Sequence, residues 1–258
     1  MTQNMLISPV RLGILLGITA ILHSVMCMEK GDQKAIYISH RTSDKIHIDG
    51  KLNESLWQNA TRTKAFSRFG SKDRAVLHPT KAMMVWDSRN LYIAFLCTDP
   101  DVWGTLVKRD DPLYKEEVVE VYVDPDGDGK YYIELEVNPR NTVTDILMDK
   151  PYSAGGKADW KWDLENFQSA VTVDGTLNNP GDTDRGWQVE MAIPWENFRE
   201  LSSDISLPPK QGDRWTINLY RIERVRGEKT EEELTAWSPT DTFHAPGNFG
   251  ILRFSEEK

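Results

Sequence analysis

Three aspartates at alternate positions form the clearest candidate for chemistry in the sequence. They lie in the run Asp124-Pro-Asp-Gly-Asp-Gly129, whose glycines and proline predict a tight turn. Carboxylates at alternate residues of such a turn offer the hard oxygen ligands that Ca²⁺ prefers. An EF-hand is excluded, because its twelfth position would be Leu135 instead of glutamate. We therefore expect a calcium site at Asp124, Asp126 and Asp128, with a solvated hairpin turn as the alternative.

Glutamates on the neighbouring strands raise the question of catalysis. Hydrolysis of a glycosidic bond uses two facing carboxyl groups ~5–9.5 Å apart, and Glu120 with Glu134 or Glu190 offers such a pair. The chain has 40 Asp and Glu residues, so two of them near each other are weak evidence. The sequence contains no nucleophile elbow, phosphate-binding loop, dinucleotide fingerprint or metal-binding histidine pair. It gives no positive evidence for an enzyme.

Short strands must position these residues. Alternation in Tyr132–Asn138 places Ile133, Leu135 and Val137 on one face. Brief helical turns are expected at Asn53–Trp57 and Pro194–Phe198. Apolar or alternating runs recur at Ile46–Ile48, Ala82–Trp86, Leu91–Thr98, Val118–Val123, Tyr131–Asn138, Phe167–Val173, Trp187–Pro194, Trp215–Ile222 and Phe249–Phe254. The pattern predicts an all-β fold, a two-sheet antiparallel β-sandwich of the jelly-roll or immunoglobulin-like kind with short helical turns.

Composition narrows the class of protein. Lys+Arg 31 against Asp+Glu 40 gives a net charge of −9, which argues against a protein that binds the phosphates of nucleic acids. With 39% hydrophobic and 28% charged residues, the chain is neither disordered nor membrane-embedded as a whole.

Residues 1–27 have the character of a targeting segment. Arg11 precedes the apolar run Leu12–Leu22, and the segment contains no acidic residue. We expect a signal peptide, or a membrane anchor, or a lipid anchor at Cys27, and hence a secreted, periplasmic or cell-surface protein. Cys97 is the other cysteine; it lies in an apolar run and is expected to be a small buried side chain.

Five phrases, in order along the chain, resemble the family 9 carbohydrate-binding modules and their wider DOMON-related relatives. They are Ile46–Trp57, Val85–Ala94, Val118–Pro125, Gly186–Pro194 and Phe249–Phe254. The resemblance covers residues 36–254 and implies a single β-sandwich domain. It also implies binding of sugar chain ends between two aromatic rings, calcium that helps to hold the fold, and association with glycoside hydrolases in polysaccharide breakdown.

The same resemblance assigns candidate site residues. Counted from the glutamate of the Val-Glu-Val-Tyr strand, which is Glu120, the first aromatic of the sugar clamp is Tyr114. Counted from the glycine of the closing strand, the second is Phe243. An arginine that bonds sugar hydroxyls in the family falls on Glu134 or Glu136, so an acceptor stands where the family has a donor.

Such a site has a simple physical logic. Flat aromatic rings, here Tyr114 and Phe243, cover the apolar C–H face of a pyranose, while carboxylates and amides bond its rim of hydroxyls, with Glu120 as the acceptor here. Trp103, Trp160 and Trp162 lie in polar loops and are further candidates for ligand contact, whereas Trp57, Trp86, Trp187 and Trp215 are expected in the core.

Two other functions stay open on the sequence. Related sandwiches bind haem through methionine, histidine or lysine, and the methionines and histidines available here are Met83, Met84, Met148, Met191, His78 and His244. Alternatively, the chain is a surface interaction module that has lost its sugar.

Overall fold

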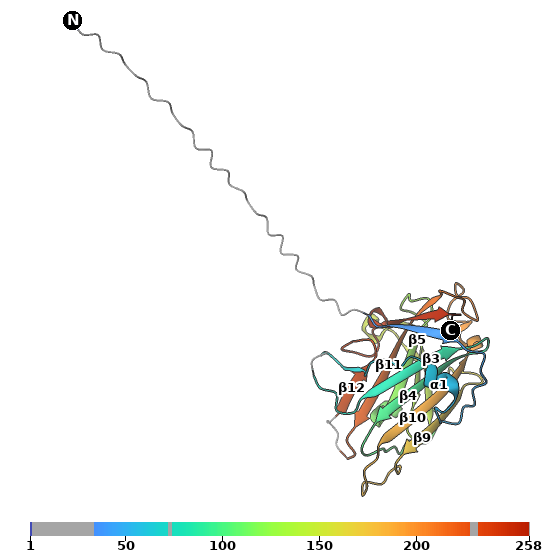
Figure 1. The fold of residues 1–258 in the computed structure, drawn as a ribbon, viewed down its shortest axis with the longest axis vertical. Coiled ribbons are helices and arrows are strands. Elements are labelled where there is room, and N and C mark those ends of the chain that lie inside the picture. The colour runs from blue at the N-terminus through green and yellow to red at the C-terminus, as the bar shows by residue number, and fades with distance from the viewer. Residues whose placement is uncertain (2–33, 72–73, 228–231, 258) are drawn as a thin grey trace. The chain divides into compact units, whose positions relative to one another are not determined.

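The computed structural model describes residues 34–71, 74–227 and 232–257 together with Met1, and within them β-strands predominate (Figure 1). The one α-helix of these described residues is α1 (Ser55–Asn59), and 3₁₀ turns occupy Leu113–Lys115, Tyr152–Ala154, Trp195–Phe198 and Pro246–Asn248. The strands are β1 (Ile36–Arg41), β2 (Ser67–Arg68), β3 (Thr80–Trp86), β4 (Asn90–Thr98), β5 (Val118–Asp124), β6 (Tyr132–Val137), β7 (Val143–Met148), β8 (Ala158–Asp159), β9 (Gln168–Asp174), β10 (Gly186–Pro194), β11 (Arg214–Arg224), β12 (Glu232–Ala236) and β13 (Gly250–Ser255).

The all-β prediction is confirmed, and most predicted runs are strands. The run Ile46–Ile48 is not a strand, because Ile46 and Ile48 pack as a loop against the cluster that α1 covers. The two predicted helical turns appear as α1 and as the 3₁₀ turn Trp195–Phe198.

The sheet is mixed and continuous, which corrects the expected two-sheet antiparallel sandwich. Its strands are hydrogen-bonded in the order β8-β7-β6-β5-β11-β13-β1-β3-β4-β10-β9. All pairs are antiparallel except those of β1, which is parallel both to β13 and to β3. The first five residues of β1 pair with β13, and its last two pair with β3. This strand therefore joins two groups of strands that would otherwise be separate sheets.

The main core lies inside this curled sheet. One cluster combines Val121 of β5 and Leu219 of β11 with Phe95 of β4 and Met191 of β10. Because strand side chains alternate between faces, these residues come from the inner faces of both halves. The tryptophans expected in the core are buried: Trp86, Trp187 and Trp215 lie in this cluster, and Trp57, on α1, lies in a second cluster that the helix covers.

Cys97 is free and buried in β4, as expected, and burial raises the pKa of its thiol to about 11. The predicted targeting segment 1–27 lies outside the described residues apart from Met1. Within the described part of the chain, no helix has both the length and the apolar character needed to cross a membrane.

Candidate functional site

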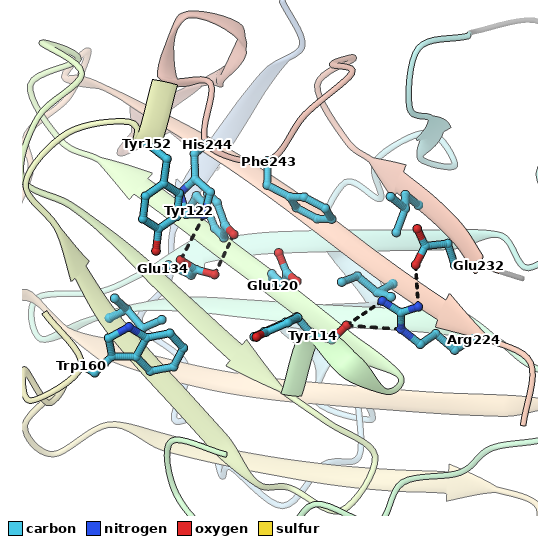
Figure 2. A pocket seen from close by; sticks show the side chains of 13 residues that line it. Tyr114, Glu120, Tyr122, Glu134, Tyr152, Trp160, Arg224, Glu232, Phe243 and His244 are labelled. Atoms are coloured by element: carbon cyan, nitrogen blue, oxygen red, sulfur yellow. Dashed lines mark hydrogen bonds and ion pairs between the residues drawn. The ribbon is translucent and has the colours of Figure 1, made fainter. Parts of the chain in front are cut away.

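A pocket of about 340 Å³ lies on the outer face of the sheet, over β5, β6 and β11 (Figure 2). Alternation along the strands explains its floor: Val119 and Val121 point into the core, so Glu120 between them points outward. The pocket is lined by Tyr114, Glu120, Tyr122, Glu134, Ile146, Tyr152, Trp160, Ile222, Arg224, Glu232, Leu234, Phe243 and His244.

Two predicted aromatic residues, far apart in sequence, line this pocket together. Tyr114 sits on the 3₁₀ turn that precedes β5 and is 41% exposed. Phe243 is half-buried in the loop that follows β12, where its ring lies 4.7 Å from the ring of Phe69 and 5.2 Å from that of Tyr220. The Tyr220 hydroxyl also donates to the Phe243 carbonyl at 2.9 Å. These contacts therefore fix the position of the Phe243 ring, whereas the more exposed Tyr114 ring is less constrained.

The predicted glutamates form a buried acidic floor. In the register of β5 and β6, Glu120 is opposite Glu136 and Tyr122 is opposite Glu134. All three glutamates are at most 6% exposed. Glu120 and Glu134 line the pocket, whereas Glu136 is not among the lining residues. The hydroxyl of Tyr122 donates to Glu134 Oε1 at 2.8 Å.

Burial makes these carboxyl groups hard to ionise. It raises the pKa of Glu134 to about 7, against the hydrogen bond from Tyr122, which lowers it. Burial, followed by the charge of Glu134, holds the pKa of Glu120 well above its usual range. Burial and the charges of Glu120 and Glu134 do the same to the pKa of Glu136. At neutral pH the floor therefore retains protons, and a protonated carboxyl can both donate and accept a hydrogen bond.

Further aromatic groups enlarge the walls. Trp160, one of the loop tryptophans named from the sequence, is 42% exposed, and Tyr152 is 49% exposed. The ring of His244 lies 4.5 Å from that of Tyr152, and its Nδ1 is 3.0 Å from the Tyr132 hydroxyl. Burial lowers the pKa of His244 to about 4, so this imidazole is neutral at pH 7. No motif in the sequence pointed to Tyr152, which lies in a loop.

Arg224 is the lining residue of most consequence that sequence reasoning missed. Its Nε and Nη2 donate to the Tyr114 carbonyl at 3.3 and 3.0 Å, and its Nη1 is 2.5 Å from Glu232 Oε2. A hydrogen-bond donor is thus present at the pocket, supplied from the end of β11. Alternation could have revealed it, because Tyr220, Ile222 and Arg224 fall on one face of that strand.

Two of the loop tryptophans lie elsewhere. Trp103 donates from Nε1 to the Arg224 carbonyl at 2.8 Å, and Trp162 packs against the main core. Glu190, considered as a catalytic partner of Glu120, is not at the pocket. It belongs to β10, where it accepts from Trp57 Nε1 at 2.8 Å.

The residues weighed as haem ligands are scattered. Met84 and Met191 are in the main core, Met83 lies beneath α1, and Met148 packs with buried tyrosines. Of the six candidates, His244 alone lines the pocket in the described part of the chain.

The predicted calcium turn joins β5 to β6. Carboxylate oxygens of Asp124, Asp126 and Asp128 lie within 4.8 Å of one another. Both oxygens of Asp124 accept backbone N–H groups, from Gly127 and Gly129, each at 2.9 Å. Burial is the main cause that raises the pKa of Asp124 to about 6. The three carboxylates suit a hard cation. Asp124 also closes the turn, because it accepts these two backbone hydrogen bonds.

Comparison with protein-family models identifies one family, and comparison with solved structures finds similar folds. The model of the carbohydrate family 9 binding domain-like family matches residues 48–257. A candidate carbohydrate-binding protein from Bacteroides uniformis has a similar structure, with a TM-score of 0.65 and 16% identity over 86% of this chain and 100% of that one. A family 9 carbohydrate-binding module from Caldicellulosiruptor kristjanssonii, solved with cellotriose, has a TM-score of 0.60 and 16% identity over 88% of this chain and 95% of that one. The same module was solved with glucose, again at a TM-score of 0.60 and 16% identity, over 86% and 97% of the two chains. No curated protein matches the sequence.

Proposed function

Because the chain belongs to the carbohydrate family 9 binding domain-like family, we propose that it binds carbohydrate, without chemically changing it, in the pocket between Tyr114 and Phe243. The observation that carries the proposal is the convergence of these two rings with Glu120 in one cavity of about 340 Å³. Its size falls in the ~300–1,000 Å³ range of small-molecule pockets.

Each part of the pocket has a role in holding a sugar. The partly exposed rings of Tyr114 and Phe243 cover the apolar face of a pyranose, a contact that removes C–H surface from water. Glu120 and Glu134 bond hydroxyl groups from the floor. Arg224 supplies N–H donors at the rim, beside Tyr114. Solved complexes of the similar module with cellotriose and glucose make β-linked glucose chains, and their ends, the first ligands to test.

Two features of the floor support a non-catalytic role. Glu120 and Glu134 belong to one sheet face, so they approach a ligand from one side, whereas glycosidases place two carboxyl groups on either side of the scissile bond. The pKa of each is also raised. Hydrolysis needs one carboxylate kept ionised beside a protonated acid.

The proposal extends to the setting of the module. Export by residues 1–27, as a cleaved signal peptide or a membrane or lipid tether, places the domain outside the cytoplasm, where polysaccharides and glycoside hydrolases are found. Calcium at Asp124, Asp126 and Asp128 stabilises the turn between β5 and β6. Mass spectrometry of native protein tests the export step: an intact Met1 in soluble cytosol contradicts it.

Titration calorimetry with glucose, cellotriose and a panel of other oligosaccharides tests the proposal directly. We expect saturable binding of at least one sugar and no release of reducing ends on prolonged incubation. Absence of binding across the panel, by folded protein with and without calcium, overturns the proposal and favours an interaction module.

A further inference from the structure

The floor of the pocket contains a buried oxygen without a partner. Glu120 is 1% exposed, and its Oε2 has no hydrogen-bond partner among the described residues. In Figure 2 its carboxyl group stands between the rings of Tyr114 and Phe243, with no dashed line to any neighbour. Native proteins pair nearly all buried polar atoms. An unpaired acceptor on a pocket floor therefore indicates a donor that arrives with the ligand.

The neighbouring groups add further carboxyl groups and little positive charge. Glu134 also lines the pocket, and Glu136 lies opposite Glu120 on β6. His244 Nε2 is 3.7 Å from Glu134 Oε2, but that imidazole is neutral at pH 7 because burial lowers its pKa to about 4. His244 therefore carries no positive charge that could balance these carboxyl groups.

The one arginine at the pocket is already engaged. Among the lining residues that the structure describes, Arg224 is the single permanent cation. Figure 2 shows its guanidinium between Glu232 and the Tyr114 carbonyl, to both of which it donates. A ligand with a carboxylate or phosphate would find no free cation here, whereas a ligand that brings its own positive charge would find free acceptors.

The walls also suit a cation. Rings of Tyr114, Tyr152, Trp160 and Phe243 line the cavity, and the first three are each more than two-fifths exposed. The face of an aromatic ring attracts an ammonium group within about 6 Å of its centre. The same rings present far more flat surface than one ammonium group needs, so a larger body with an apolar face fits them better.

We propose that the sugar bound in this pocket is an amino sugar, whose protonated amine rests on Glu120 and Glu134 while its ring packs against Tyr114 and Phe243. The proposal rests on the carbohydrate-binding function proposed above and names the class of sugar. A neutral sugar would give Glu120 only hydroxyl donors. An ammonium group makes shorter and stronger charge-assisted hydrogen bonds, and a bare metal ion would leave most of the 340 Å³ cavity empty.

Proton linkage gives the proposal a second signature. The titratable groups that face Glu120 are Glu134 and Glu136 on β6, Tyr122 on β5, Tyr220 on β11 and, from the loops, Tyr114 and His244. Of these groups, Glu134 acts together with burial to raise the pKa of Glu120 and so keeps it protonated in the empty pocket. An ammonium group favours the ionised carboxylate. Binding of an amino sugar therefore releases a proton, and binding of a neutral sugar does not.

The test is titration calorimetry of the full chain with three trisaccharides of the same linkage, at about pH 6, where a sugar amine is protonated. The ligands are the β-1,4-linked trimers of glucosamine, N-acetylglucosamine and glucose. We expect the glucosamine trimer to bind about tenfold more tightly than either neutral trimer. Repetition in two buffers of different ionisation enthalpy measures the released proton.

Variants assign the effect to the floor. Glu120→Gln keeps the shape and removes the charge, so the ratio of the affinity for the glucosamine trimer to that for the glucose trimer should fall toward one, even where the affinity for both trimers falls. Glu165→Gln, at an exposed residue away from the pocket, is the matched control and should keep the preference. Glu134→Gln and the proton release of the unaltered chain decide the matter if Glu120→Gln fails to fold.

The outcomes separate this inference from the proposed function. Equal binding of all three trimers, or a preference for a neutral one, overturns the amino-sugar inference and leaves carbohydrate binding standing. Binding of none by folded protein overturns both. Choline is a fourth ligand: if it binds as tightly as the glucosamine trimer, the pocket recognises ammonium without a sugar and the inference is wrong.

Discussion

Glu120 and Glu136 lie directly opposite each other on the antiparallel strands β5 and β6, and each is 1% exposed. Like charges in this position destabilise a sheet. The strands tolerate the pair because burial and the charge of Glu134 hold the pKa of each carboxyl well above its usual range, so both keep their protons. The pocket floor is thus built at some cost in stability, which is typical of binding sites.

This floor makes stability depend on pH. The pKa of Glu134 is about 7 in the folded chain, against 4.5 for the ordinary group. A raised carboxyl pKa stabilises the fold below about pH 4.5, and that contribution is lost as pH rises to 7. Its size is on the order of 3 kcal/mol. We expect the melting temperature of the unaltered protein to fall across this window, and Glu134→Gln to flatten the fall. An equal fall in both proteins would show that Glu134 is not responsible.

Calcium should raise stability through the turn between β5 and β6. Binding to the native state alone adds RT ln(1 + [L]/Kd), about 2.7 kcal/mol at a hundredfold excess over Kd. We expect the melting temperature to drop with chelator and recover with millimolar calcium. Asp126→Asn with Asp128→Asn should abolish the recovery at little other cost, because both side chains are exposed. A midpoint unmoved by chelator or calcium counts against the site.

Arg221 holds together a second buried charge cluster, inside the sheet. It is fully buried, donates to Asp99 at 2.9 Å and to Glu223, and lies beside Glu117. Removal of one member of a buried ion cluster leaves uncompensated charge, which costs ~3–5 kcal/mol. Arg221→Met should therefore lower the midpoint of urea unfolding strongly.

The matched control for that change is Arg185→Met, which breaks an exposed pair with Asp174. Exposed ion pairs add little to stability, so its midpoint should stay close to that of the unaltered protein. Equal effects of the two substitutions would mean that the Arg221 cluster contributes no more than a surface pair.

Local pattern predicted the strands and failed on their pairing. Alternation such as that of Ile133, Leu135 and Val137 identified β6 and its inner face correctly. The parallel position of β1 between β13 and β3 was not predictable, because strand order depends on contacts between distant segments. The pattern also predicted a strand that does not form: Ile46 and Ile48 lie in a loop, where they pack against the cluster that α1 covers.

Residues of the candidate site could be predicted only where a family motif on a nearby strand gave a position from which to count along the sequence. Tyr114 and Phe243 were located from motifs of the resembled family, and both line the pocket. Arg224 and Tyr152 reach it from segments without such motifs. The resemblance places the acceptor Glu134 or Glu136 on β6 where the family has a donor, and the structure brings a donor, Arg224, to the pocket from β11. Alternation places Arg224 on the outer face of β11, but only the tertiary arrangement brings that residue to the pocket.

The most direct measurement of the central claim is paired titration and melting of Tyr114→Ala and Phe243→Ala, with Tyr131→Ala as control. Tyr131 is 52% exposed and does not line the pocket. Each ring of a ligand clamp is worth about 1–3 kcal/mol of binding, roughly five- to two-hundredfold in affinity. We predict that Tyr114→Ala and Phe243→Ala each lose sugar affinity by this amount, whereas Tyr131→Ala keeps it. The melting temperature should change little in each case, although more for Phe243→Ala than for Tyr114→Ala because Phe243 is better packed. Unchanged sugar affinity of a folded Tyr114→Ala protein would contradict the account.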